Sequence, residues 1–167
     1  SLGPEMKSTG EVLGISDNFT EALYKGLIAT GLNIPRKGSV LLTVRNTDKQ
    51  ELIPIAQDFE SLGFNIYATG NTAHTLHNNY IAANVVKKIG EGSPDILELI
   101  ESGKIDLVVN TPTRGRQPDR DGFKIRRKAV EHSIPCLTSL DTARAVVETL
   151  KQNMEEKDVQ VIDITTI

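Results

Sequence analysis

Residues 40–44 read Val40-Leu41-Leu42-Thr43-Val44, and this short apolar run decides the fold of the chain. Its lack of polar alternation is typical of a strand buried on both faces of a parallel sheet. Similar runs follow at residues 64–68, around Val85-Val86, at residues 105–109 and at residues 134–138, with a helical stretch after each. Strands that alternate with helices imply right-handed crossovers. The sequence therefore predicts an α/β fold: a doubly wound, mainly parallel five-stranded sheet with helices on both faces.

The helical stretches carry start and stop signals as well as an apolar face. Between Asp48 and Gly63, apolar residues recur at helical spacing, at Leu52, Ile55, Ala56, Phe59 and Leu62. Pro54 marks the first turn of this helix or bends it. Residues 70–78 predict a short helix, and Ser93 is expected to cap another whose first position is Pro94.

The C-terminal third predicts two more helices and a last strand. The helix after Asp121 is expected to turn Ile125, Ala129 and Val130 inward, and Ser139 or Asp141 caps the helix that follows. Residues 160–164 predict a final edge strand.

The first 37 residues do not fit the strand–helix alternation. Phe19, Ala22, Leu23 and Leu27 predict one face of an amphipathic helix, and residues 33–38 predict a linker. Residues 1–16 favour no regular element and are typical of the tail of something upstream. The chain is therefore divided into residues 1–16, a connecting helix and linker at residues 17–37, and an α/β domain at residues 38–167.

Composition narrows the class of protein. A chain of 167 residues with 38% apolar and 25% charged residues fits one globular domain. A net charge of −3 argues against a general nucleic-acid binder, and no run approaches the roughly 18 apolar residues of a membrane span. The single cysteine, Cys136, excludes an internal disulfide and a cysteine-based zinc site, and it fits a reducing, cytoplasmic location.

Polar side chains follow four of the predicted strands at their carboxyl ends, where open parallel sheets bind ligands. Hydroxyls, amides and lysines predominate there, and Asp48 is the one carboxylate among them. These groups, with the N–H groups of a helix start, are what a phosphate dianion requires. The residues are Thr43, Asn46, Thr47 and Lys49; Thr69, Gly70, Asn71 and Thr72; Lys87 and Lys88; and Asn110, Thr111 and Thr113.

Each of these pieces has a simpler interpretation. Thr69 and Thr72 alone are more often turn formers or helix caps, and Lys49 and Lys88 alone are more often solvated charges. Their convergence on one sheet edge favours a phosphate site instead. The chain has neither the GxxxxGK[ST] phosphate loop nor the GxGxxG dinucleotide motif.

Other residues are weaker candidates for a functional site. His74 and His77 are spaced for a metal but lack a clear third ligand, so surface histidines are favoured and no metal site is predicted. Cys136 has no evident activating partner and is interpreted as a core residue. Arginines are dense near Asp119 and Asp121, which interleave with them, and this predicts a salt-bridged loop; an anion-contacting loop or a subunit contact is the alternative. The arginines are Arg114, Arg116, Arg120, Arg126 and Arg127.

Several stretches together resemble the large chain of carbamoyl-phosphate synthase. Residues 3–14 resemble the end of its second ATP-grasp unit, and residues 38–167 are similar to its C-terminal regulatory domain, of methylglyoxal-synthase-like fold. The matching pieces are Leu41-Leu42-Thr43-Val44-Arg45 with Asp48-Lys49, Ala68-Thr69-Gly70-Asn71-Thr72-Ala73, Lys88-Ile89-Gly90-Glu91-Gly92-Ser93-Pro94, Val108-Val109-Asn110-Thr111-Pro112 and Ile125-Arg126-Arg127.

The resemblance implies an allosteric module of an ATP-dependent ligase that serves pyrimidine and arginine biosynthesis, not the catalytic machinery. A nucleotide effector such as UMP or IMP is expected as ligand. The upstream ATP-grasp domains and the glutaminase small subunit are expected as partners, self-association is left open, and no nucleic acid or membrane is expected. The fragment itself is expected to need no cofactor, whereas the parent enzyme uses ATP with Mg or Mn. The family's phosphate positions fall on Thr43, Lys49, Thr69, Thr72, Lys88 and Asn110, with Thr111 or Thr113 as a further hydroxyl.

Two alternatives belong to other classes. The same fold serves methylglyoxal synthase, a lyase whose base is a carboxylate in the phosphate pocket. Its motifs are broken here, where the corresponding stretches are Gly90-Glu91-Gly92, Asp119-Arg120-Asp121 and Thr69-Gly70-Asn71-Thr72-Ala73. The other alternative is an oligomerisation domain with a vestigial anion pocket.

Overall fold

The computed structural model describes residues 12–29, 33–113 and 120–166, and their side chains at residues 19–29, 33–113 and 120–155. Five strands form one sheet in the order β3-β2-β1-β4-β5, and every pair is parallel. The strands are β1 (Ser39–Thr43), β2 (Asn65–Thr69), β3 (Ala83–Val86), β4 (Leu107–Asn110) and β5 (Cys136–Leu137). The predicted α/β class and the five parallel strands are confirmed.

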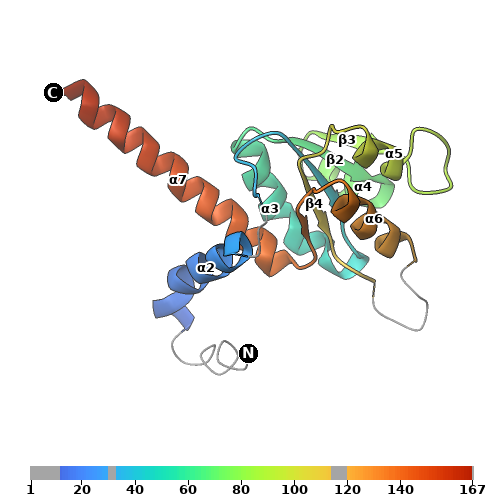
Figure 1. Ribbon diagram of the computed structural model, residues 1–167, viewed down its shortest axis with the longest axis horizontal. Coiled ribbons are helices and arrows are strands. Elements are labelled where there is room, and N and C mark those ends of the chain that lie inside the picture. The colour runs from blue at the N-terminus through green and yellow to red at the C-terminus, as the bar shows by residue number, and fades with distance from the viewer. Residues whose placement is uncertain (1–11, 30–32, 114–119, 167) are drawn as a thin grey trace.

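Helices cover both faces of the sheet, as predicted (Figure 1). They are α2 (Val12–Ala29), the 3-10 turn η1 (Asn46–Asp48), α3 (Lys49–Ser61), α4 (Gly70–Asn78), α5 (Ile96–Glu101), α6 (Arg120–Glu131) and α7 (Leu140–Thr166). On one face, Val40 and Leu42 of β1 pack into a core cluster with α3, α4 and the first part of α7. On the other face, Leu41 packs into a second cluster with α5 and α6. Both faces of β1 are therefore dry, which is why its sequence shows no alternation.

The helix ends follow local chemistry. Helix α3 follows Asp48 directly and ends before Gly63, whose φ of +92° favours glycine. Pro54 lies inside α3 and not in its first turn. Helix α5 is capped by Asp95 through a capping box with Glu98, so the prediction that Ser93 caps this helix and Pro94 opens it is wrong. The Asp95 carboxylate accepts from two backbone N–H groups, which a Ser93 cap two residues earlier could not replace.

Helix α7 is longer than the sequence pattern indicated. Residues 160–164 continue this helix, so the predicted final edge strand is wrong. No glycine or proline occurs between residues 140 and 166 to end the helix. Ser139 caps its start, because the Ser139 hydroxyl accepts from the Thr142 N–H at 3.2 Å. In Figure 1, α7 runs outward from the sheet domain, with α2 packed beside its first turns.

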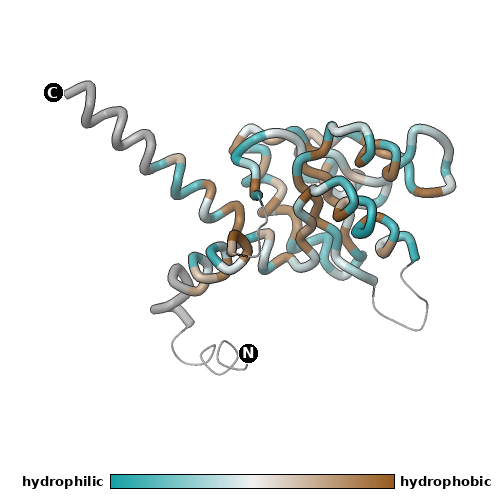
Figure 2. Tube along the Cα trace, in the orientation of Figure 1, coloured by the Kyte–Doolittle hydropathy of each residue, from teal (hydrophilic) through white to brown (hydrophobic). Residues whose placement is uncertain are grey.

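Two predicted apolar faces are shifted. Val130 on α6 is 72% exposed, whereas Ile125 and Ala129 are buried as expected. On α2, the side chains packed against the core are Tyr24 and Leu27, and Phe19 remains half exposed. Helix α2 also begins at Val12, within the segment that favoured no regular element, while residues 1–11 lie outside the described part. Figure 2 shows the apolar residues gathered in the sheet and around the base of α7.

Among the described residues, no helix is both long enough and apolar enough to cross a bilayer.

Replacing Phe59 with alanine tests the packing on the α3 face. The ring is fully buried and meets Phe64 edge-on, with centroids 5.1 Å apart. We expect Phe59→Ala to lower the free energy of unfolding by about 3–5 kcal/mol, because it leaves a cavity in the core. The matched control is Phe123→Ala, at a ring that is 57% exposed, with an expected change within about 0.5 kcal/mol. Equal midpoints for the two variants in urea denaturation would contradict this packing.

Candidate anion-binding site

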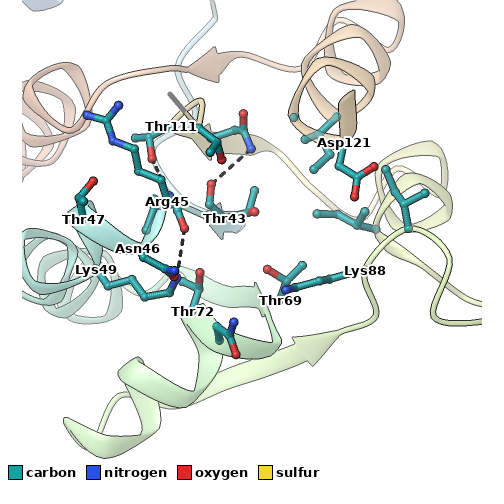
Figure 3. Close-up of a pocket in the computed structure, with 18 residues that line it drawn as sticks. Thr43, Arg45, Asn46, Thr47, Lys49, Thr69, Thr72, Lys88, Thr111 and Asp121 are labelled. Carbon is teal, nitrogen blue, oxygen red and sulfur yellow. Dashed lines mark hydrogen bonds between the residues drawn. The ribbon is translucent and has the colours of Figure 1, made fainter. Parts of the chain in front are cut away.

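A pocket of about 690 Å³ lies at the carboxyl edge of the sheet (Figure 3). All the positions that the family resemblance assigned to phosphate binding line it: Thr43, Lys49, Thr69, Thr72, Lys88, Asn110, Thr111 and Thr113. Lys87 and Gly70, which also follow the strands, are not among the described lining residues, and the Lys87 ammonium donates to the Ser93 carbonyl at 3.4 Å. The parallel register explains this convergence, because Thr43 pairs with Asn110 and Thr69 pairs with Val86 at the last positions of their strands. The segments that follow these strands must then surround one hollow.

Two buried threonines of this pocket, Thr69 and Thr72, keep their hydroxyls available to a ligand. Thr69 and Thr72 are only 5% and 2% exposed, yet neither hydroxyl makes a hydrogen bond within the described part of the chain. Thr69 occupies the N-cap position of α4 without capping through its side chain. The simpler interpretation of these threonines as caps therefore does not hold. Buried polar groups normally have hydrogen-bond partners, so buried hydroxyls that line a cavity without such a bond indicate a ligand.

The lysines give this pocket its positive charge. In Figure 3, Lys49 and Lys88 reach toward the pocket from different segments. The Lys49 ammonium donates to the Asn46 side-chain oxygen and lies 3.5 Å from the Val44 carbonyl oxygen. Burial, and secondly the charge of Lys88, lower the pKa of Lys49 below its ordinary value. Two cations that repel each other across a pocket favour an anion between them.

Helix α4 adds the N–H groups of its first turn. It begins at Gly70 and runs for nine residues, with Thr69 and Thr72 beside its N-terminus. The first N–H groups of a helix lack intrahelical acceptors, and the helix dipole favours negative charge there. The hydroxyls, the lysines and this helix start thus present donors to one space.

Thr111 and Thr113 play different parts. The Thr111 hydroxyl oxygen accepts from the Arg45 backbone N–H at 2.9 Å, and Thr111 is 5% exposed. This bond ties the segment after β4 to the segment after β1. Thr113 is exposed at the pocket margin. Both line the pocket, and the Thr111 O–H can still donate to a ligand there.

Asp48 does not oppose an anion in the pocket. Its carboxylate forms an ion pair with Arg45 at 2.8 Å, and it is not among the described lining residues. Arg45 also donates to the Pro112 carbonyl at 3.2 Å, so one side chain neutralises Asp48 and joins two strand ends. The sequence pattern gave Arg45 no role, because an arginine beside an aspartate is common at surfaces.

The pocket has an apolar end that the sequence interpretation missed. Ile89, Ile96 and Ile125 line it together with Asp121 and Gly122. Figure 3 shows the Asp121 carboxylate on the far side of the pocket from Lys49. These residues belong to the loop after β3, to α5 and to α6, so only the packing of helices brings them to the strand ends. The pocket therefore combines a cationic, hydroxyl-rich end with an apolar end that carries one carboxylate.

The weaker candidates stay outside this site. The His77 ring bonds to the Ala83 carbonyl at 2.8 Å, and the described residues contain no cluster of His, Cys, Asp and Glu suited to a metal. Burial raises the pKa of the Cys136 thiol to about 11, although Arg126 partly opposes this, so the thiol is protonated at neutral pH. Asp119 and the arginines at 114 and 116 lie outside the described residues, and Arg127 pairs with Glu131.

Fold and pocket together define a parallel α/β domain with a pocket at its carboxyl edge that is lined by lysines and threonines. The family model of the MGS-like domain matches residues 51–138. The chain belongs to this MGS-like domain family, as the resemblance implied.

Individual relatives support this family membership. A carbamoyl phosphate synthase large chain from Lachnoclostridium phytofermentans is 48% identical over 166 residues. The match covers 99% of this chain but only 16% of that protein, so the chain spans a small part of this curated relative. The crystal structure of ForH aligns with a TM-score of 0.51 at 23% identity, over 70% of this chain and 79% of that one, which shows likeness of fold.

Titration of Lys49 tests the electrostatics of the pocket. In the free chain we expect its pKa below 10.5, because burial and Lys88 disfavour the ammonium form. Phosphate in the pocket favours that form and should raise the pKa of Lys49. Phosphate affinity should therefore fall as pH rises through the pKa of the free Lys49. NMR of the lysine side chains, with an unstructured lysine peptide as reference, measures this, and a Lys49 titration unchanged by phosphate would contradict it.

Proposed function

We propose that this chain is the regulatory domain of a carbamoyl-phosphate synthase large subunit of the glutamine-hydrolysing type, and that its pocket binds the phosphate of a nucleotide effector of the UMP or IMP class. One observation carries the proposal. Lys49 and Lys88 line the same pocket as Thr69 and Thr72, whose hydroxyls make no hydrogen bond within the described part of the chain. The 48% identity to a carbamoyl phosphate synthase large chain supports the parent enzyme.

The two ends of the pocket suit a phosphorylated nucleoside. A phosphate dianion needs compensation for lost water, and hydrogen bonds to charged groups supply about 1.5–3 kcal/mol each, against about 0.3–1 kcal/mol for a helix end. The apolar end, with Ile89, Ile96 and Ile125, offers surface for a base, and the Asp121 carboxylate can accept from hydroxyl or N–H donors. An inorganic phosphate would leave this second end unused.

The remaining parts of the proposal concern the parent enzyme. Residues 1–16 would continue an upstream ATP-grasp unit, residues 17–37 would connect it to the regulatory domain at residues 38–167, and a glutaminase subunit would complete a cytoplasmic enzyme. ATP and its Mg or Mn would belong to the upstream units. Effector control would then serve pyrimidine and arginine synthesis through two states of the whole enzyme.

Alanine variants of the two lysines test the effector site. We expect Lys49→Ala and Lys88→Ala each to weaken UMP or IMP binding by about 10- to 150-fold, since each removes one hydrogen bond from a charged donor. The matched control is Lys104→Ala, at an exposed lysine before β4, on the opposite edge of the sheet. Calorimetric titration at low salt measures the affinities. Wild-type affinity for these nucleotides in both variants would contradict the site.

We further propose that the chain has no lyase activity of its own. A methylglyoxal synthase needs a carboxylate base near the phosphate, whereas the carboxylate that lines the described pocket, Asp121, lies away from Lys49. Incubation with dihydroxyacetone phosphate should give no methylglyoxal above the buffer rate. Turnover that Asp121→Asn abolishes would instead support the lyase class.

A further inference from the structure

The side chain of Asn110, at the end of β4, makes two hydrogen bonds: it donates one and accepts the other. Its Nδ2 donates to the backbone carbonyl of Thr43 at 3.3 Å, and its Oδ1 accepts from Nη1 of Arg126 at 2.6 Å. Asn110 is 4% exposed and lines the pocket. The amide therefore has one end on the neighbouring strand and the other on helix α6.

These two contacts allow only one orientation of the amide. After a flip, the NH₂ group would face the guanidinium and Oδ1 would face the Thr43 carbonyl, so donors would meet donors and acceptors would meet acceptors. The bond from Arg126 is charge-assisted, which makes loss of this acceptor especially costly. The amide oxygen is thus committed to Arg126, and the second N–H of the NH₂ group is left for the pocket.

Arg126 contacts Asn110 but does not itself line the described pocket. Its side chain is half-buried between α6 and the sheet. Its hydrogen bond to Asn110 places the guanidinium at the end of β4. Its described bond to Asn110 is therefore a route by which Arg126 can act on a ligand without touching it.

We propose that Arg126 is a positioning residue that locks the Asn110 amide as a hydrogen-bond donor, so that this part of the pocket selects acceptor groups such as phosphate oxygens and disfavours donor groups. The inference rests on the proposed phosphate site. It assigns Arg126 a role in selectivity without contact to the ligand, because a freely rotating amide could accept from a neutral donor as well as donate to an anion.

A double-mutant cycle on the 167-residue chain, with inorganic phosphate as probe, tests this role. We expect Arg126→Gln and Asn110→Ala each to weaken phosphate binding on the order of tenfold, as expected for one hydrogen bond to a charged group. The double variant should bind within about twofold of Asn110→Ala alone, because the arginine acts through the amide. Arg126→Lys keeps the charge, so it should bind phosphate more tightly than Arg126→Gln but less tightly than the unmodified chain. If Arg126→Gln does not fold, Arg126→Lys takes its place in the cycle.

Arg127→Gln is the matched control. Arg127 is the next residue of α6, is exposed and pairs with Glu131, so its loss removes the same charge without touching Asn110. We expect less than a twofold change. Equal weakening by Arg126→Gln and Arg127→Gln, or additive effects of Arg126→Gln and Asn110→Ala, would overturn the positioning role. Failure of the wild-type chain to bind phosphate would instead overturn the proposed function, and the inference with it.

Discussion

Strand β1 hydrogen-bonds to β2 on one side and to β4 on the other, and both pairings are parallel. Its residues Val40, Leu41 and Leu42 are fully buried, so helices must cover both faces of the sheet. Parallel pairing directs the carboxyl ends of all strands to one edge. The segments after β1, β2 and β4 therefore meet whether or not a ligand is present, and the pocket is a consequence of strand register.

The pocket concentrates groups that oppose folding when it is empty. The buried hydroxyls of Thr69 and Thr72, which have no hydrogen-bond partner among the described residues, and two lysines that repel each other are unfavourable in a free domain. The core clusters on both sides of the sheet offset this cost. An anion would satisfy the hydroxyls and the lysines together, so binding would stabilise the domain by mass action. A site built on rigid strand ends also keeps its donors in place before the ligand arrives.

The pocket touches helices from both faces of the sheet. Lys49 opens α3 and Thr72 lies in the first turn of α4 on one face, while Asp121 and Ile125 belong to α6 on the other. Helix α3 packs against α7, and α7 packs against α2. A contiguous chain of packed helices thus joins the pocket to α2, the helix that follows the N-terminal segment. Coupling between distant sites requires such a physical connection together with two states that differ in affinity.

The sequence by itself determined the fold class and the donors of the pocket. Continuous apolar runs mark parallel strands, and the carboxyl-edge rule gathers the residues that follow them, from Thr43 to Asn110, without coordinates. Only the tertiary structure decided the extent of α7, the exposure of Val130, the ion pair of Arg45 with Asp48 and the hydrogen bond from Arg126 to Asn110. Periodicity describes one element at a time, whereas these features depend on which side chains two elements bring within hydrogen-bond or van der Waals distance.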